Sequence, residues 1–157
     1  MNLRELTESL VEHEGKEDTP YRDSRGLWTV GIGRCLETNP ITKAEWKWLL
    51  DNKAVTFQLT GIGLQYLFAN DVRSATTQIK ARCDFWDRLN DVRQNVLIEM
   101  CFQMGIDRLL GFNKMFAALR VGNWEEAKKE ALDSDWHKQT PNRVRVLAEA
   151  LRTGEWP

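Results

Sequence analysis

The sequence predicts an α+β protein that is mainly helical and carries one small antiparallel sheet near its N-terminus. Apolar residues recur at spacings of three and four through most of the chain, which is the helical period. A glycine-punctuated stretch between Tyr21 and Leu36 breaks that period and is richer in β-branched and aromatic residues. With 157 residues, 42% hydrophobic and 29% charged, the composition is that of a globular protein with one sizeable core.

The N-terminal third of the sequence predicts the first helix and the sheet. Leu3, Leu6 and Leu10 predict a helix over residues 2–13, which Gly15 ends. The Asp23–Gly26 segment has Asp first and Gly fourth, as in a type I turn. Leu27–Val30 favours a strand, so two or three short antiparallel strands are expected here.

The remaining elements are predicted to be helices. Thr42–Glu45 has the pattern of a capping box and opens a helix that runs to about residue 55. An apolar stripe predicts one long helix over about 64–81. Residues 84–88 are expected to form about one turn. Further helices are predicted over 92–104, 113–121, 123–133 and 141–153, with Asn123 and Pro141 at two of their starts.

Charge and cysteine content exclude several classes of protein. The chain has 22 Lys+Arg and 23 Asp+Glu, a net charge of −1, whereas nucleic-acid-binding proteins usually show a basic excess. Its three cysteines form no CxxC pair and its two histidines no HExxH motif, so we expect no metal, no cofactor and no disulfide framework. A local basic face is suggested near the C-terminus by Lys138, Arg143, Arg145 and Arg152, with Glu149 as the acidic exception.

The first residues are charged and amphipathic, without the apolar core of a signal peptide. The sequence also lacks a run of about 18 apolar residues, so no membrane-spanning helix is expected.

Two carboxylates are the candidate catalytic groups. Glu14 continues the apolar stripe of the first helix and lies at its C-terminus, and desolvation and the helix dipole there both disfavour the ionised form. Asp23 lies on a turn, where local hydrogen bonds keep a carboxylate ionised. One protonated and one ionised carboxyl group is the arrangement of glycosidases. A helix-terminal Glu paired with an arginine, an ordinary turn Asp and an ordinary strand Thr29 are the alternatives.

The spacing of these residues resembles a known family. Glu14, Asp23 and Thr29 follow the pattern E-x8-D-x5-T, within a run that continues through Trp28 to Gly33. This pattern looks like the signature of the T-even phage lysozymes, glycoside hydrolase family 24. Further landmarks of that family follow in order: Phe102–Gly105, Gly111–Phe112, Asn123–Ala127, Gln139–Arg143 and Arg152–Trp156.

The resemblance implies a role for each matching residue. Glu14 would be the general acid and Asp23 the group that activates water, with Thr29 helping to hold that water. Inversion of the anomeric centre would follow, with the carboxyl groups roughly 6.5–9.5 Å apart. Arg143 would support Glu14. The implied substrate contacts are Cys35, Phe102, Gln103, Met115 and Glu130.

Three departures from the family pattern are visible. The usual histidine after Gly-Ile-Gly is Arg34, and the matching aspartate is Asp71, so we predict an Arg34–Asp71 ion pair in which Arg34 is always charged. Met115 and Glu130 occupy positions that small polar residues usually fill. The nearly neutral net charge also differs from the basic character common in the family.

The resemblance implies a two-lobed lysozyme-like fold in a single domain over residues 1–157. The small lobe would span about 14–62 and the connecting helix about 64–81. A helical lobe would contain about 82–157 and the N-terminal helix 2–13. The glycan would bind between the lobes.

The expected activity is that of an endolysin, a muramidase that hydrolyses bacterial peptidoglycan and lyses the host cell. Its partners would be the glycan strands and a separately encoded holin-type membrane pore. A monomer is expected, made in the host cytoplasm, without nucleic acid or stable membrane insertion. Two alternatives remain: a lytic transglycosylase with a single acid, and a wall-binding or tail-associated module without catalysis.

Overall fold

The computed structural model describes residues 2–55 and 59–156, and their contacts divide the chain into two compact units. One unit comprises residues 8–74, and the other comprises residues 1–7 with 75–157. The boundaries fall inside two helices, α1 (Leu3–Glu14) and α3 (Gly61–Lys80), and not at the helix ends.

The unit of residues 8–74 contains the sheet. Its strands β1 (Glu17–Arg22), β2 (Trp28–Gly31) and β3 (Arg34–Cys35) form an antiparallel meander in the order β1-β2-β3. The predicted sheet is therefore present, although β1 begins four residues earlier than the aromatic pattern indicated. The predicted turn is also present, because the Gly26 N–H donates to the Asp23 carbonyl at 2.9 Å.

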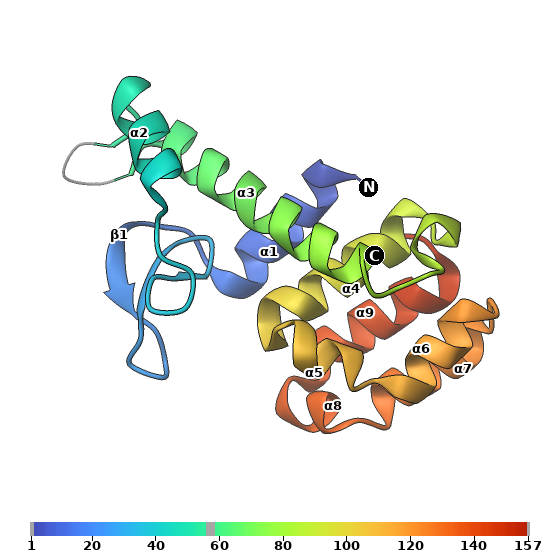
Figure 1. The fold of residues 1–157 in the computed structure, drawn as a ribbon. Helices are drawn as coiled ribbons and strands as arrows, with labels where there is room; N and C mark the ends of the chain where they lie inside the picture. The colour runs from blue at the N-terminus through green and yellow to red at the C-terminus, as the bar shows by residue number, and fades with distance from the viewer. Residues whose placement is uncertain (1, 56–58, 157) are drawn as a thin grey trace. The chain divides into compact units, whose positions relative to one another are not determined.

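The same unit contains α2 (Lys43–Asp51) beside the first turns of α3 (Figure 1). Thr42 and Glu45 make the predicted capping box, but the helix ends at Asp51, four residues earlier than expected. The sheet and the helices share a small core that consists of Val30, Leu49, Ala54, Leu59, Leu64 and Leu67. The N-terminal end of α3 lies close to α2 and to the segment that follows it. A methyl group on Gly63 would lie 3.2 Å from Leu49 Cδ2 and 2.5 Å from the Ala54 carbonyl oxygen.

The other unit is helical in its described residues. Its elements after α3 are a 3₁₀ turn η1 (Trp86–Arg88), α4 (Asp91–Met104), α5 (Ile106–Leu110), α6 (Asn113–Arg120), α7 (Trp124–Leu132), α8 (Asp135–Gln139) and α9 (Pro141–Thr153). Helix α9 packs against α4, α7 and α8 (Figure 1). The side chains of Val144, Leu147 and Leu151 on its inner face are completely buried. None of the described helices is long and apolar enough to cross a membrane.

Helix signals in the sequence predicted most of these elements. Asn123 caps α7 by accepting a hydrogen bond from the Glu126 N–H at 3.2 Å, and Pro141 occupies the first turn of α9. Helices α5 and α8 were not predicted. Each has only five residues, too few for a hydrophobic period to repeat, so tertiary packing decides their conformation.

The suggested basic face near the C-terminus is largely neutralised. Lys138 pairs with Asp135 at 2.7 Å, and Arg143 pairs with Glu99 at 3.3 Å. Arg152 forms ion pairs with both Glu149 and Glu125. These acidic partners come from other turns or other helices, so the linear sequence overstated the positive charge of this region.

Candidate active site in the sheet-bearing unit

Glu14 is the last residue of α1, and its side chain is partly exposed. The helix ends there because Gly15 takes a positive φ of 77°, with its N–H still donating to the Val11 carbonyl at 3.0 Å. The turn between β2 and β3 lies directly against the Glu14 side chain. A methyl group built onto Gly33 would lie 3.1 Å from the Cβ of Glu14 and 3.3 Å from its Cγ and Oε2.

Asp23 follows β1 and is fixed by its own turn. Its Oδ1 accepts hydrogen bonds from the N–H groups of Leu27 and Arg25, each at 2.9 Å. Its Oδ2 pairs with the Arg25 guanidinium at 3.1 Å. The Leu27 N–H, followed by these Arg25 contacts, holds the pKa of Asp23 below its usual value, so the carboxylate is ionised at neutral pH as the sequence predicted.

Thr29 is buried in β2 and is linked to Asp23 through a shared peptide group. Its hydroxyl lies 3.4 Å from the Leu27 carbonyl oxygen, which also accepts a hydrogen bond from the Asp23 N–H at 3.0 Å. The Leu27 N–H in turn donates to the Asp23 carboxylate. The backbone of Leu27 therefore holds both residues in one hydrogen-bonded unit.

A row of side chains crosses the sheet through Thr29. Tyr21 on β1 and Cys35 on β3 are its cross-strand partners, so the three side chains share one face. Burial raises the pKa of Tyr21, and the neighbouring carboxylates of Glu14, Glu17 and Asp23 raise it further. The phenol therefore stays protonated at neutral pH and lies within electrostatic range of both candidate catalytic groups. The sequence assigned no role to Tyr21, because only the strand register brings it to this face.

Cys35 is partly exposed. A hydrogen bond from the Thr38 side chain lowers the pKa of its thiol, and backbone N–H groups of the following turn act in the same direction.

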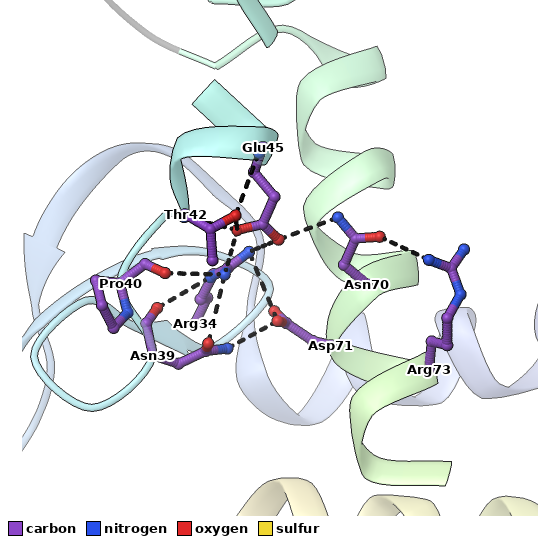
Figure 2. A network of polar contacts seen from close by, with 8 residues as sticks. All are labelled: Arg34, Asn39, Pro40, Thr42, Glu45, Asn70, Asp71 and Arg73. Atoms are coloured by element: carbon purple, nitrogen blue, oxygen red, sulfur yellow. Dashed lines mark hydrogen bonds and ion pairs between the residues drawn. The ribbon is translucent and has the colours of Figure 1, made fainter. Parts of the chain in front are cut away.

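Arg34 follows Gly33 and points into a buried polar cluster (Figure 2). Its guanidinium binds the Glu45 carboxylate through two hydrogen bonds of 3.0 and 2.9 Å, and it donates to the carbonyl oxygens of Asn39 and Pro40 at 3.1 and 3.2 Å. The predicted Arg34–Asp71 ion pair is present at 3.6 Å. It is the weaker of the two carboxylate contacts, because Glu45 takes the shorter and bidentate position.

The sequence identified Glu45 only as part of a capping box. In the structure, one carboxylate oxygen accepts hydrogen bonds from the Thr42 N–H and hydroxyl at 2.8 and 2.9 Å, and the other accepts one from Asn70 at 3.0 Å. These bonds and Arg34 outweigh the cost of burial and lower the pKa of Glu45 to about 2. Glu45 thus caps α2 and neutralises Arg34 at the same time.

Asp71 carries the surplus negative charge of this cluster. Burial is the main reason that its pKa is raised to about 6, and the Glu45 charge adds to it. Arg34 and the Asn39 amide, which donates at 2.8 Å, act against the rise. Arg34 has already committed most of its donors to Glu45 and to carbonyl oxygens, so it compensates Asp71 only in part.

The raised pKa of Asp71 predicts a pH-dependent stability. Because the folded pKa of about 6 exceeds the ordinary aspartate value of 3.8, the contribution of Asp71 to the free energy of unfolding is fully present below about pH 4 and is lost as the pH rises through 6. Relative to an Asp71→Asn variant, the wild type should gain about 1 to 3 kcal/mol of unfolding free energy between pH 7 and pH 4.5. Urea unfolding of both proteins at the two pH values measures this. An exposed carboxylate, changed in Asp51→Asn, serves as the control, and an equal pH response of all three proteins would contradict the prediction.

The remaining predicted site residues lie in the helical unit. The side chain of Gln103 is fixed, because its Oε1 accepts from the Trp136 indole N–H at 2.7 Å and its Nε2 donates to Thr140 at 3.3 Å. Phe102 is partly exposed, and Glu130 lies 4.0 Å from Lys114. Met115 is only 1% exposed, so its side chain has the surroundings of a core residue and not those of a glycan contact.

Arg143 has a partner that the sequence did not predict. Glu99 lies on α4, its side chain is completely buried, and its Oε2 pairs with Arg143 at 3.3 Å. The expected support of Glu14 by Arg143 stays a prediction, because the two residues belong to different units. Among the described residues, no group of three or more His, Cys, Asp or Glu side chains is arranged to hold a metal ion.

Comparison with known proteins identifies the family of this chain. Residues 11–152 match the family model described as "Phage lysozyme". The chain is 30% identical to "Probable T4-type lysozyme 1" of Dictyostelium discoideum, over 95% of this chain and 94% of that protein. It is 31% identical to "Pre-baseplate central spike protein Gp5" of Enterobacteria phage T4, over 95% of this chain and 28% of that protein.

The family match extends over most of the chain and includes Glu14, Asp23 and Thr29. The similarity to the Dictyostelium protein extends over nearly the full length of both chains. The mainly helical α+β architecture with its small antiparallel sheet is the one that the resemblance implied. The chain therefore belongs to the phage lysozyme family and is a glycosidase of the lysozyme type.

Proposed function

We propose that this chain hydrolyses the β-1,4 bond between N-acetylmuramic acid and N-acetylglucosamine in bacterial peptidoglycan, with inversion at the anomeric carbon. The observation that carries the proposal is the pair Glu14 and Asp23 at the family's spacing, in two different environments. Asp23 is held ionised by the hydrogen bonds of its turn, whereas Glu14 ends a helix and lies against the β2–β3 turn.

Glu14 acts as the general acid. It donates its proton to the glycosidic oxygen while the bond from that oxygen to C1 breaks, so the leaving sugar departs as a neutral alcohol.

Asp23 acts as the general base. It takes a proton from a water molecule whose oxygen forms the new bond to C1 on the opposite face of the ring. The Leu27 peptide group hydrogen-bonds to both the Asp23 carboxylate and the Thr29 hydroxyl and fixes their relative positions. In this proposal both groups hold the same water. Because water attacks directly, the reaction proceeds in one displacement and needs no covalent intermediate.

Each unit has its own proposed glycan contacts. In the sheet-bearing unit the contact is Cys35, beside Thr29. In the helical unit the proposed contacts are Phe102, Gln103 and Glu130. Gln103 is suited to this role because Trp136 fixes the orientation of its amide group, leaving the second hydrogen of Nε2 available to a sugar or peptide carbonyl.

The biological role that fits this activity is lysis of a bacterial host. The protein acts as a monomer, is made in the host cytoplasm, and reaches the wall after a separately encoded holin-type pore opens the membrane.

The test is digestion of purified peptidoglycan by the purified chain, with reducing ends and product masses as readouts. The proposal predicts new reducing ends on N-acetylmuramic acid, with products that contain one added water for each bond cleaved. Products that carry 1,6-anhydro sugars would identify a lytic transglycosylase instead. Binding to the polymer without cleavage across pH 4–9 would identify a wall-binding module.

A further inference from the structure

The β2–β3 turn makes an unusually close approach to the side chain of Glu14. Gly33 lies in this turn with a φ of +67°, in the left-handed region that favours glycine. Even a methyl group at this position would be 3.1 Å from Glu14 Cβ and 3.3 Å from Oε2, which is tighter than ordinary van der Waals contact. The bare backbone of Gly33 therefore forms one wall of the space in which the Glu14 side chain lies.

The turn itself is fixed by the next residue. Arg34 pairs with Val30 in the β2–β3 ladder, and its side chain is 3% exposed. Its five hydrogen bonds to Asn39, Pro40 and Glu45 tie it to the β3–α2 connection and to α2. Asp71 adds an ion pair from α3. A residue held at this many points restricts the movement of the glycine that precedes it.

We propose that Gly33 is a positioning residue for Glu14, and that the buried Arg34–Glu45 pair keeps the β2–β3 turn in place against the acid. This inference rests on the proposed function of Glu14. It connects Arg34, which stands where the family pattern usually has histidine, with the position of the general acid Glu14. Because proton transfer in glycoside hydrolysis depends on the placement of the acid, a displacement of Glu14 by a few tenths of an ångström reduces turnover more than binding.

The test compares Gly33→Ala with Gly31→Ala. Gly31 lies in the same hairpin and has nearly the same φ, +69°, but a methyl group there would meet only Leu64 Cδ2, at 3.4 Å. Both variants carry the same backbone strain, and only Gly33→Ala pushes against Glu14. We expect Gly33→Ala to lower kcat on soluble peptidoglycan fragments at least ~10-fold relative to Gly31→Ala, with KM changed by less than about twofold.

A second readout follows the acid directly and does not depend on turnover. In protein labelled with ¹³C at glutamate carboxyl carbons, the Glu14 resonance is assigned from its loss in Glu14→Gln. We expect this resonance to shift in Gly33→Ala and to stay in place in Gly31→Ala. A merely structural role for Gly33 would lower the stability of both variants without moving this resonance.

Glu45→Gln gives an independent test if Gly33→Ala does not fold. It leaves Gly33 intact and removes the charge that holds Arg34. We expect the Glu14 resonance to shift and kcat to fall about threefold or more, with KM nearly unchanged. Lys47→Gln, which changes an exposed ion pair on the same helix, is the matched control.

The outcomes separate this inference from the proposed function. A wild type that cleaves peptidoglycan, together with a Gly33→Ala variant equal to Gly31→Ala in kcat and in the Glu14 resonance, would overturn the positioning role alone. An inactive wild type, or full activity in Glu14→Gln, would overturn the proposed function and this inference with it.

Discussion

Replacing Glu14 with glutamine should lower kcat/KM for peptidoglycan cleavage by about 10²- to 10⁴-fold, the usual contribution of a general acid. Glutamine has nearly the same shape, and Glu14 is partly exposed at a helix end, so the fold should tolerate the change. The amide cannot supply the proton that the leaving oxygen needs. Cleavage rates of purified peptidoglycan, corrected for folded protein by circular dichroism, measure the loss.

Glu12→Gln is the matched control for this experiment. Glu12 lies two residues earlier on α1 and is exposed, so its change alters the same helix by the same charge. Activity close to that of the wild type is expected. Equal activity in Glu12→Gln and Glu14→Gln would show that Glu14 is an ordinary helix-terminal carboxylate.

Replacing Arg34 with alanine should cause a large loss of stability in the sheet-bearing unit. The Glu45 carboxylate would lose both of its hydrogen bonds to Arg34, and Asp71 would lose its cation. Removing one partner of a buried ion pair typically costs about 3 to 5 kcal/mol, since the remaining charge is left in a poorly solvated site. Urea unfolding at pH 7 gives the difference in the free energy of unfolding.

Lys47→Ala is the corresponding control, because Lys47 forms a short ion pair with Asp51 at 2.6 Å on the surface of α2. Both side chains are more than half exposed, so the expected cost is below about 1 kcal/mol. A similar small loss in both variants would contradict the role assigned to Arg34. Recovery of stability in Arg34→Ala on acidification to about pH 5 is also expected, because Asp71 then takes up a proton.

Local signals in the sequence predicted the long elements well. The stripe of Leu64, Leu67, Phe68, Val72, Ala75 and Ile79 is buried throughout. The capping box at Thr42 and the stop at Gly15 depend on neighbouring residues only, so they can be read without the fold. The extent of β1 was underestimated, because Glu17, Asp18 and Pro20 have little intrinsic strand preference. Glu17 belongs to the strand through its pairing with Gly31 of β2.

The sequence proposed the candidate catalytic residues and the Arg34–Asp71 pair, but not the other contacts around them. The family spacing identified Glu14, Asp23 and Thr29, whereas the contact of Gly33 with Glu14 depends on how the hairpin folds back onto α1. In the sequence, Glu45 could be recognised only as part of the capping box of α2. In the structure, its carboxylate also neutralises Arg34. Glu99 could have been noticed in the sequence, because it is a charged residue among apolar neighbours on α4. Its ion pair with Arg143 explains why a charged residue is buried there.

The anomeric configuration of the first product tests the two-carboxylate mechanism most directly. Proton NMR of soluble peptidoglycan fragments, recorded within minutes of adding enzyme, distinguishes the α and β forms of the new reducing end before they equilibrate. Direct attack of a water held by Asp23, with Glu14 as the acid, predicts that the α form appears first from the β-linked glycan. Initial release of the β form, or of a 1,6-anhydro sugar, would contradict the mechanism.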